Sequence, residues 1–271
     1  MAPSLAGCEP RGRFRGTAAH YLAGRPPYAD LLIRRVAELV RLGPRHSVLD
    51  LGCGPGVLAR MFAPLAGEVV AMDPEPEMLA AAAEHCAGLA NVQLVAGGSN
   101  DLAPSSGRFR LVAMGRSFHW MDRAETLRRL DTLVEPGGAV VHFHTHHADV
   151  PANAWTERFR ELRRRYAGDR HDGPQEHGER WVRHEAFLLA SPFRCVEAHS
   201  VFEERTFDSD TLVDRVFSMS STTRVLLGGR AEALERDLRA LMPEIAPDGR
   251  LTEVIESNAL LGRRAGEEAI A

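Results

Sequence analysis

Short apolar runs alternate with amphipathic stretches through the first half of the chain. The apolar runs, each bounded by turn-forming residues, have the length and composition of buried parallel strands. They lie at 47–51, 68–73, 91–96, 109–115 and 139–143. Segments with helical periodicity occupy 29–41, 58–65, 74–87 and 123–133. This alternation predicts an α/β fold with a doubly wound, mostly parallel sheet.

The second half has a different pattern. An arginine-rich amphipathic helix (153–166), a polar loop (167–178) and a short helix (181–189) come first. Residues 193–207 alternate like a strand, 208–219 and 231–241 are helical, and 251–261 predict an antiparallel seventh strand. We therefore predict a Rossmann-like, seven-stranded sheet with a helical cap inserted at 151–192. The remaining parts would be an N-terminal lid segment and helix (1–45), a binding core (46–150) and a C-terminal part of the core (193–271).

A glycine-rich turn follows the first predicted strand. It reads Asp50-Leu51-Gly52-Cys53-Gly54-Pro55-Gly56, and a helix follows. Glycines permit a tight turn and leave no Cβ between the backbone and a ligand. The second strand ends in Asp73, about 20 residues after Gly52, where a carboxylate can accept hydrogen bonds from ribose hydroxyls. Strand, glycine turn, helix, strand and acid together predict a nucleoside-binding half-site.

The spacing within the turn discriminates between nucleosides. A dinucleotide fingerprint requires a third glycine where Val57 stands. Asp50, two residues before Gly52, would repel a pyrophosphate and suits a ligand that carries an ammonium group. These residues disfavour a nicotinamide dehydrogenase. The glycines alone would also fit an ordinary turn in another α/β protein.

Composition and charge exclude several classes of protein. A hydrophobic content of 44% and a charged content of 26% are those of a globular chain. The net charge of −4 gives no reason to expect nucleic acid as a partner. No apolar run approaches the roughly 20 residues of a membrane helix, so we expect no membrane partner. Scattered cysteines and the lack of an apolar leader favour a cytoplasmic protein with free thiols.

With this turn and the motifs that follow it, the chain resembles the class I S-adenosylmethionine-dependent methyltransferases. Phe118-His119-Trp120 after the fourth strand and Glu135-Pro136-Gly137-Gly138 before the fifth are similar to motifs of that family. Tyr21, Arg25 and Tyr28 resemble the N-terminal segment of its small-molecule, trans-aconitate-methyltransferase-like (type 11) branch. There this segment folds over the cofactor. The alternative is that the tyrosines pack locally and Pro26-Pro27 only fixes the entry to a helix.

The resemblance implies S-adenosylmethionine as cofactor and assigns residues to it. The implied cofactor-binding residues are Tyr21, Arg25, Asp50, Gly52, Cys53, Gly54, Gly56, Asp73, Pro74, Met78, Ser99, Asn100, Gly115 and Ser117. Met78 would lie near the adenine, although it could instead fill the helix–sheet interface. Gly98 stands where the family often has an acid, so Ser99 and Asn100 would contact the adenine. Substrate contacts are implied for Tyr28, Trp120, Ser218 and Ser221.

Histidines are the candidate catalytic residues. An amine or alcohol acceptor must lose a proton on methylation, and a base near the reactive end of the cofactor would help. His119 is best placed, with a structural role in orienting Trp120 as the alternative. His144 and His146 lie at the end of the fifth strand and share a face with His142. They could shuttle protons, bind substrate, ligate a metal or be ordinary histidines; we assign no metal.

The predicted function is S-adenosylmethionine-dependent methyl transfer to N or O of a polar small molecule. We favour a natural product, such as an amino sugar or aminoglycoside. A tRNA or protein methyltransferase is the first alternative, but the chain has no basic, aromatic-interleaved patch. A nucleoside-binding scaffold without turnover is the second. Neither the acceptor nor the oligomeric state follows from the sequence, and a homodimer is compatible with it.

Overall fold

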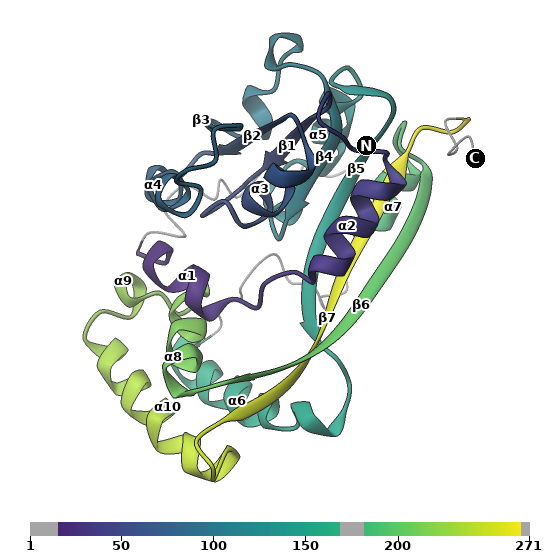
Figure 1. Ribbon diagram of the computed structural model, residues 1–271. Helices are drawn as coiled ribbons and strands as arrows, with labels where there is room; N and C mark the ends of the chain where they lie inside the picture. Colours follow the sequence, from purple (N-terminus) through teal and green to yellow (C-terminus); the bar gives the residue numbers. More distant parts are fainter. Residues whose placement is uncertain (1–15, 169–181, 267–271) are drawn as a thin grey trace, which may run out of the picture.

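The predicted α/β architecture is confirmed by the computed structural model, which describes residues 16–168 and 182–266. Seven strands form one sheet in the order β3-β2-β1-β4-β5-β7-β6 (Figure 1). The strands are β1 (Ser47–Leu51), β2 (Glu68–Asp73), β3 (Val92–Ala96), β4 (Phe109–Gly115), β5 (Val134–His147), β6 (Cys195–Phe207) and β7 (Leu251–Arg263). The first five are parallel, and β7 is antiparallel to both β5 and β6.

Helices cover both faces of the parallel part of the sheet. On one face lie α2 (Asp30–Leu39), α3 (Val57–Phe62) and α4 (Pro76–His85). On the other lie α5 (Arg123–Leu130) and α7 (His184–Leu189). Alternate strand residues enter the two cores, as Val48 and Leu49 do from β1. The buried strands therefore read as continuous apolar runs.

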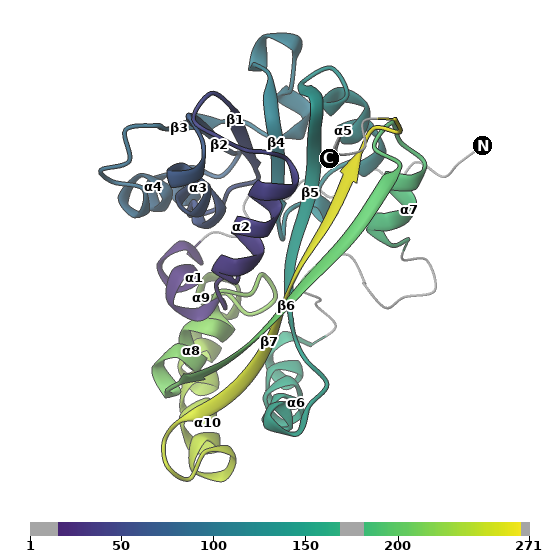
Figure 2. The same ribbon diagram turned by 45° about the vertical axis from the view of Figure 1, so that its right-hand side comes forward.

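A third core lies where β5, β6 and β7 run beyond the other strands (Figure 2). It is formed by α6 (Trp155–Ala167), α8 (Ser209–Phe217), α9 (Arg224–Leu227) and α10 (Ala231–Ile245). The short helix α1 (Ala18–Gly24) packs on α8 and lies between this part and the sheet (Figure 1). The predicted insertion at 151–192 thus supplies α6 to the third core and α7 to the sheet.

Strand β5 differs from its prediction. The sequence predicts a turn at 135–138 and a strand at 139–143, but the strand runs from Val134 to His147. Val134 pairs with Phe109 and Ala139 with Leu111, so the intervening residues bulge out of the ladder. The strand lasts longer than expected because residues up to His147 pair with β7.

Local signals set several helix ends. Asp122 caps α5 by accepting a hydrogen bond from the Glu125 amide at 3.1 Å. Asp208 caps α8 in the same way, through the Thr211 amide at 3.0 Å. Within the described residues, no helix is both long and apolar enough to cross a membrane. The predicted flexible lead at 1–12, like most of the loop at 167–178, lies outside the described residues.

Candidate functional site

The glycine turn after β1 has a conformation that depends on its glycines. Gly52, Gly54 and Gly56 have φ values of +72°, +54° and +77°, in the left-handed region that disfavours other residues. A Cβ on Gly52 would stand 2.5 Å from the Cβ of Ser117, so this glycine lets β1 and the end of β4 approach. A Cβ on Gly54 would meet nothing within 4 Å. The backbone at Gly54 is therefore open to a ligand.

Asp73 ends β2 beside this turn. Its carboxylate accepts hydrogen bonds from the Gly54 amide at 2.8 Å and the Glu75 amide at 2.9 Å. Burial raises the pKa of Asp73, and these two hydrogen bonds oppose that shift. One side chain thus braces the open part of the turn and keeps further lone pairs for a hydroxylated ligand.

Asp50 is buried at the other side of the turn, where its carboxylate accepts a hydrogen bond from the Ala59 amide of α3 at 2.9 Å. Burial raises the pKa of Asp50 to about 7, and the negative charge of Asp73 acts in the same direction. A cationic group close to the turn would favour the ionised form of this carboxyl. Cys53, between the first two glycines, is buried as a thiol.

The segment expected to reach the adenine follows β3. Ser99 and Asn100 form a short 3-10 turn with Asp101, whose carboxylate accepts a hydrogen bond from the Gly98 amide at 2.8 Å. A Cβ on Gly98 would meet nothing within 4 Å, so this backbone is open as well. Met78, from α4, is 3% exposed. Its position fits either a ligand contact or a place in the interface, and its role stays a prediction.

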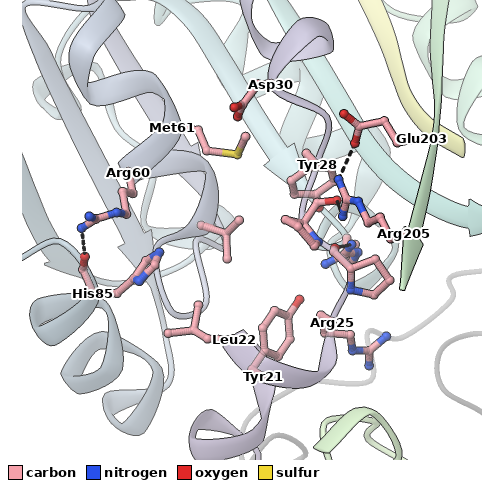
Figure 3. Close-up of a pocket in the computed structure, with 14 residues that line it drawn as sticks. Tyr21, Leu22, Arg25, Tyr28, Asp30, Arg60, Met61, His85, Glu203 and Arg205 are labelled. Atoms are coloured by element: carbon pink, nitrogen blue, oxygen red, sulfur yellow. Dashed lines mark hydrogen bonds and ion pairs between the residues drawn. The ribbon is translucent and has the colours of Figure 1, made fainter. Parts of the chain in front are cut away.

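Tyr21, Arg25 and Tyr28 meet at one pocket of ≈ 340 Å³ (Figure 3). The hydroxyl of Tyr21 points from α1 into this pocket, opposite the wall formed by α3 and α4. Val57, the first residue after the glycine turn, lines the same space. Four arginines line the pocket against two acids, so its charge favours an anionic group; these residues are Arg25, Arg60, Arg116, Arg205, Asp30 and Glu203.

Arg116 is a residue of this pocket that the sequence reasoning did not select. It follows β4 with φ at +55°, a conformation uncommon for an arginine. Its guanidinium donates to the Pro26 carbonyl at 2.5 Å and to the Thr145 hydroxyl at 2.7 Å, and it lies over the Tyr28 ring. A further hydrogen bond joins it to Tyr21. Arg116 therefore fastens the N-terminal segment to the sheet, and only its place beside the Phe118 motif could have indicated it.

Helix α1 is also fastened to α8. The Arg25 guanidinium donates to the Ser218 carbonyl at 3.0 Å, and His20 bonds Asp214 at 2.7 Å. Ser218 and Ser221, the predicted substrate contacts, are both buried. The Ser218 hydroxyl donates to the Arg215 carbonyl at 2.7 Å, so in this arrangement it serves the end of α8.

His119 lies in the 3-10 turn after β4, next to Ser117, whose hydroxyl donates to the Leu51 carbonyl at 2.7 Å. Its ring is 4.9 Å from that of Trp120, centroid to centroid. Burial lowers the pKa of His119 to about 4, with smaller contributions from Arg123 and Arg25. The imidazole is therefore neutral near pH 7, as a proton acceptor must be.

The histidines of β5 divide between the two faces of the strand, as the alternation predicts. His142, His144 and His146 form a row, with ring centroids 5.3 Å and 5.8 Å apart. His147 points the other way and bonds Glu253 at 2.9 Å. The row also includes His184 of α7, whose ring centroid is 4.2 Å from that of His142. The sequence offered no indication of this partner, because α7 and β5 are separate elements that lie far apart along the chain.

No group of three or more His, Cys, Asp or Glu side chains within 16–168 and 182–266 is placed to hold a metal ion. The metal interpretation of the row therefore has no geometric support among these residues.

Comparison with known proteins gives a family match for part of the chain. Residues 48–138 match the methyltransferase domain family. A malonyl-acyl-carrier-protein O-methyltransferase of Pseudescherichia vulneris is 36% identical over 41% of this chain and 42% of its own length. An uncharacterized methyltransferase of Mycobacterium tuberculosis is 26% identical over 86% of this chain and 88% of its own.

The fold is shared with solved structures. A protein from Anaeromyxobacter dehalogenans assigned to the type II methyltransferases superimposes with a TM-score of 0.59 at 19% identity. The superposition covers 89% of this chain and 97% of the other. The sequence likeness to the O-methyltransferase is thus confined to less than half of that enzyme, whereas the superposition on the Anaeromyxobacter dehalogenans protein covers most of both chains.

Proposed function

Since the chain belongs to the class I S-adenosylmethionine-dependent methyltransferases, we propose that it transfers a methyl group from this cofactor to N or O of a polar small molecule. One observation carries the proposal. The glycine turn presents open backbone at Gly54, between a carboxylate at the end of β2 and the buried Asp50. This arrangement fits a nucleoside that carries a cationic amino acid.

The chain's own residues have distinct roles in this proposal. The glycine turn and Asp73 hold the nucleoside, and Asp50 supplies negative charge near its ammonium group. Arg25, with Tyr21, lies where the pocket beside Val57 favours a carboxylate. The cofactor supplies a methyl group activated by its sulfonium. The protein must align an acceptor atom about 3 Å from that methyl and exclude water.

His119 is the proposed base for the acceptor. It is neutral near pH 7, lies beside the ends of β1 and β4, and is next to Trp120. Imidazole and indole side chains on this side of β5 suit a polar acceptor with an aromatic or sugar ring. We propose an amino sugar, an aminoglycoside or a related natural product, methylated on N or O.

Calorimetric titration with S-adenosylhomocysteine tests the cofactor assignment, with NAD as the comparison ligand. We expect micromolar affinity for the first and none for the second. Asp73→Ala should weaken this affinity at least tenfold, because the variant loses both the ribose acceptor and the brace at Gly54. Glu84→Ala, an exposed acid on α4, is the control and should bind like the parent. Absence of S-adenosylhomocysteine binding to the parent protein would overturn the proposal.

A further inference from the structure

Five imidazoles form a continuous row from the buried end of β4 to the surface. His119 is followed by His184 at 6.4 Å between ring centroids, and His184 by His142 at 4.2 Å. His144 lies 5.3 Å beyond, and His146 another 5.8 Å. These residues come from three separate elements: the turn after β4, helix α7 and strand β5. We call them the histidine row.

The two ends of the row differ in exposure. His119 is partly buried beside the proposed acceptor position, whereas the His146 side chain is 51% exposed. His146 also forms an ion pair with Glu256 of β7 at 2.8 Å. The Nδ1 atoms of His142 and His144, in the middle, are buried without a hydrogen-bond partner. Buried polar atoms in this state are uncommon and call for an explanation.

Charged groups differ between the two ends of the row. Arg123 of α5 stands 3.3 Å from His184 Nδ1; it disfavours a positive charge on His184 and, with Arg25, on His119. At the outer end, His146 disfavours a positive charge on His144, as Arg116 does to a smaller extent, whereas Glu256 and Glu185 favour one. The two arginines therefore oppose a proton at the inner end, and the two acids attract one at the outer end.

The four inner rings of the row, those of His119, His184, His142 and His144, are neutral at rest. Burial is the largest cause in each case and lowers the pKa of His144 to about 4 and of His184 to about 3. It lowers the pKa of His142 as well. A neutral imidazole carries one N–H donor and one acceptor nitrogen, so it can accept a proton on one side and release one on the other.

We propose that the histidine row is a proton exit path, which carries the proton of the acceptor from His119 to solvent at His146 and Glu256. This inference rests on the proposed methyl transfer. Methylation of a neutral O–H or N–H acceptor forms a bond from the heteroatom to the methyl carbon. It breaks the carbon–sulfur bond with its electron pair left on sulfur, and it releases one proton. His119 takes that proton, and each further ring takes one proton and gives up another.

The path predicts that His144 controls exchange between the buried rings and solvent. In protein labelled with 15N-histidine, nuclear magnetic resonance measures the exchange rate of the His142 ring N–H with water. His144→Leu should slow this exchange at least tenfold. His199→Leu is the matched control, since His199 lies on β6, which is separated from β5 by β7, and bonds Glu197 instead; it should leave the rate unchanged.

A second variant protects the test against misfolding. His146 is exposed, so His146→Leu should fold and still slow exchange at His142 several-fold. Unchanged exchange in this variant, or equal slowing in His199→Leu, would overturn the exit path. Calorimetry should show that His144→Leu and His146→Leu bind S-adenosylhomocysteine as the parent does, because neither His144 nor His146 contacts the glycine turn. If the parent itself does not bind, the proposed function fails, while the exchange rates still report whether the row conducts.

Discussion

Gly54 and Gly88 are a matched pair at the level of single residues. Both have positive φ, and a Cβ on either would meet no protein atom within 4 Å. Alanine at each position should therefore cost a similar 1–2 kcal/mol of backbone strain, roughly. Only Gly54 faces the proposed ligand. We expect Gly54→Ala to abolish calorimetric binding of S-adenosylhomocysteine and Gly88→Ala to preserve it. Equal affinities would show that the ligand does not approach the turn.

Asp50 should make the stability of the ligand-free protein depend on pH. The pKa of its carboxyl is about 7 when folded, against about 3.9 when unfolded. The folded state thus binds the proton more tightly, so stability from this group is fully present below pH 4 and is lost as pH rises to 7. The loss is at most about 4 kcal/mol.

Asp50→Asn removes that proton exchange and keeps the shape of the side chain. Urea unfolding at pH 5 and pH 8 measures the difference in the free energy of unfolding between parent and variant. Taking this difference cancels the contribution of the buried histidines, whose lowered pKa values change stability with pH in the opposite direction. We expect the variant to gain stability relative to the parent at pH 8. A constant difference across the pH range would count against a protonated Asp50.

Helix α1 depends on Gly24 for its position. A Cβ on Gly24 would overlap the backbone of Asp214 and Arg215, which cannot move without shifting α8. Gly24→Ala should therefore displace α1 and weaken S-adenosylhomocysteine binding several-fold, with a loss of stability of roughly 1–3 kcal/mol. Gly43→Ala is the control, because its nearest neighbour would be a His46 ring atom at 3.9 Å. Undiminished affinity in Gly24→Ala would mean that α1 does not cover the cofactor.

Regular elements were predictable where local sequence determines them. Strands β1, β2 and β4 carry apolar runs bounded by turn-forming residues, which can be recognised without knowledge of their partners, and their bounds match the prediction. The turn at 135–138 was misassigned because its pairing with β4 continues after a bulge. The polar end of β5 is a strand only because β7, more than 100 residues later, supplies its partner.

The candidate site was predictable to a different extent. The glycine turn follows β1 and Asp73 ends β2. Because β1 and β2 are consecutive parallel strands, the proximity of the turn and Asp73 follows from the order of the elements. His184 and Arg116 act through contacts with residues far along the chain, as Arg116 does with Pro26. Periodicity cannot reveal such pairs, since it reports only which face of one element a residue occupies.

The whole molecule is held together where the long strands leave the parallel sheet. Arg215 of α8 forms a two-pronged, buried ion pair with Glu253 of β7, at 2.6 Å and 3.0 Å. The Arg215 Nε also donates to the Gly24 carbonyl of α1 at 3.0 Å, and Glu253 bonds His147 of β5. One charge pair therefore joins α1, the third core and the sheet.

Glu253→Gln should destabilise the protein far more than removal of a surface pair. Burial opposes ionisation of Glu253, yet hydrogen bonds from His147 and Arg215 lower its pKa, so the substitution leaves a buried arginine without its counter-charge. We expect a loss of about 3–5 kcal/mol in urea unfolding. Glu244→Gln, in the exposed pair with Arg158, should cost less than about 1 kcal/mol. Because α1 and the third core share this pair, α1 and the sheet should unfold in one transition in the parent. In Glu253→Gln, limited proteolysis at α1 should precede loss of the sheet. Similar costs for the two variants would show that the buried pair does not couple these parts.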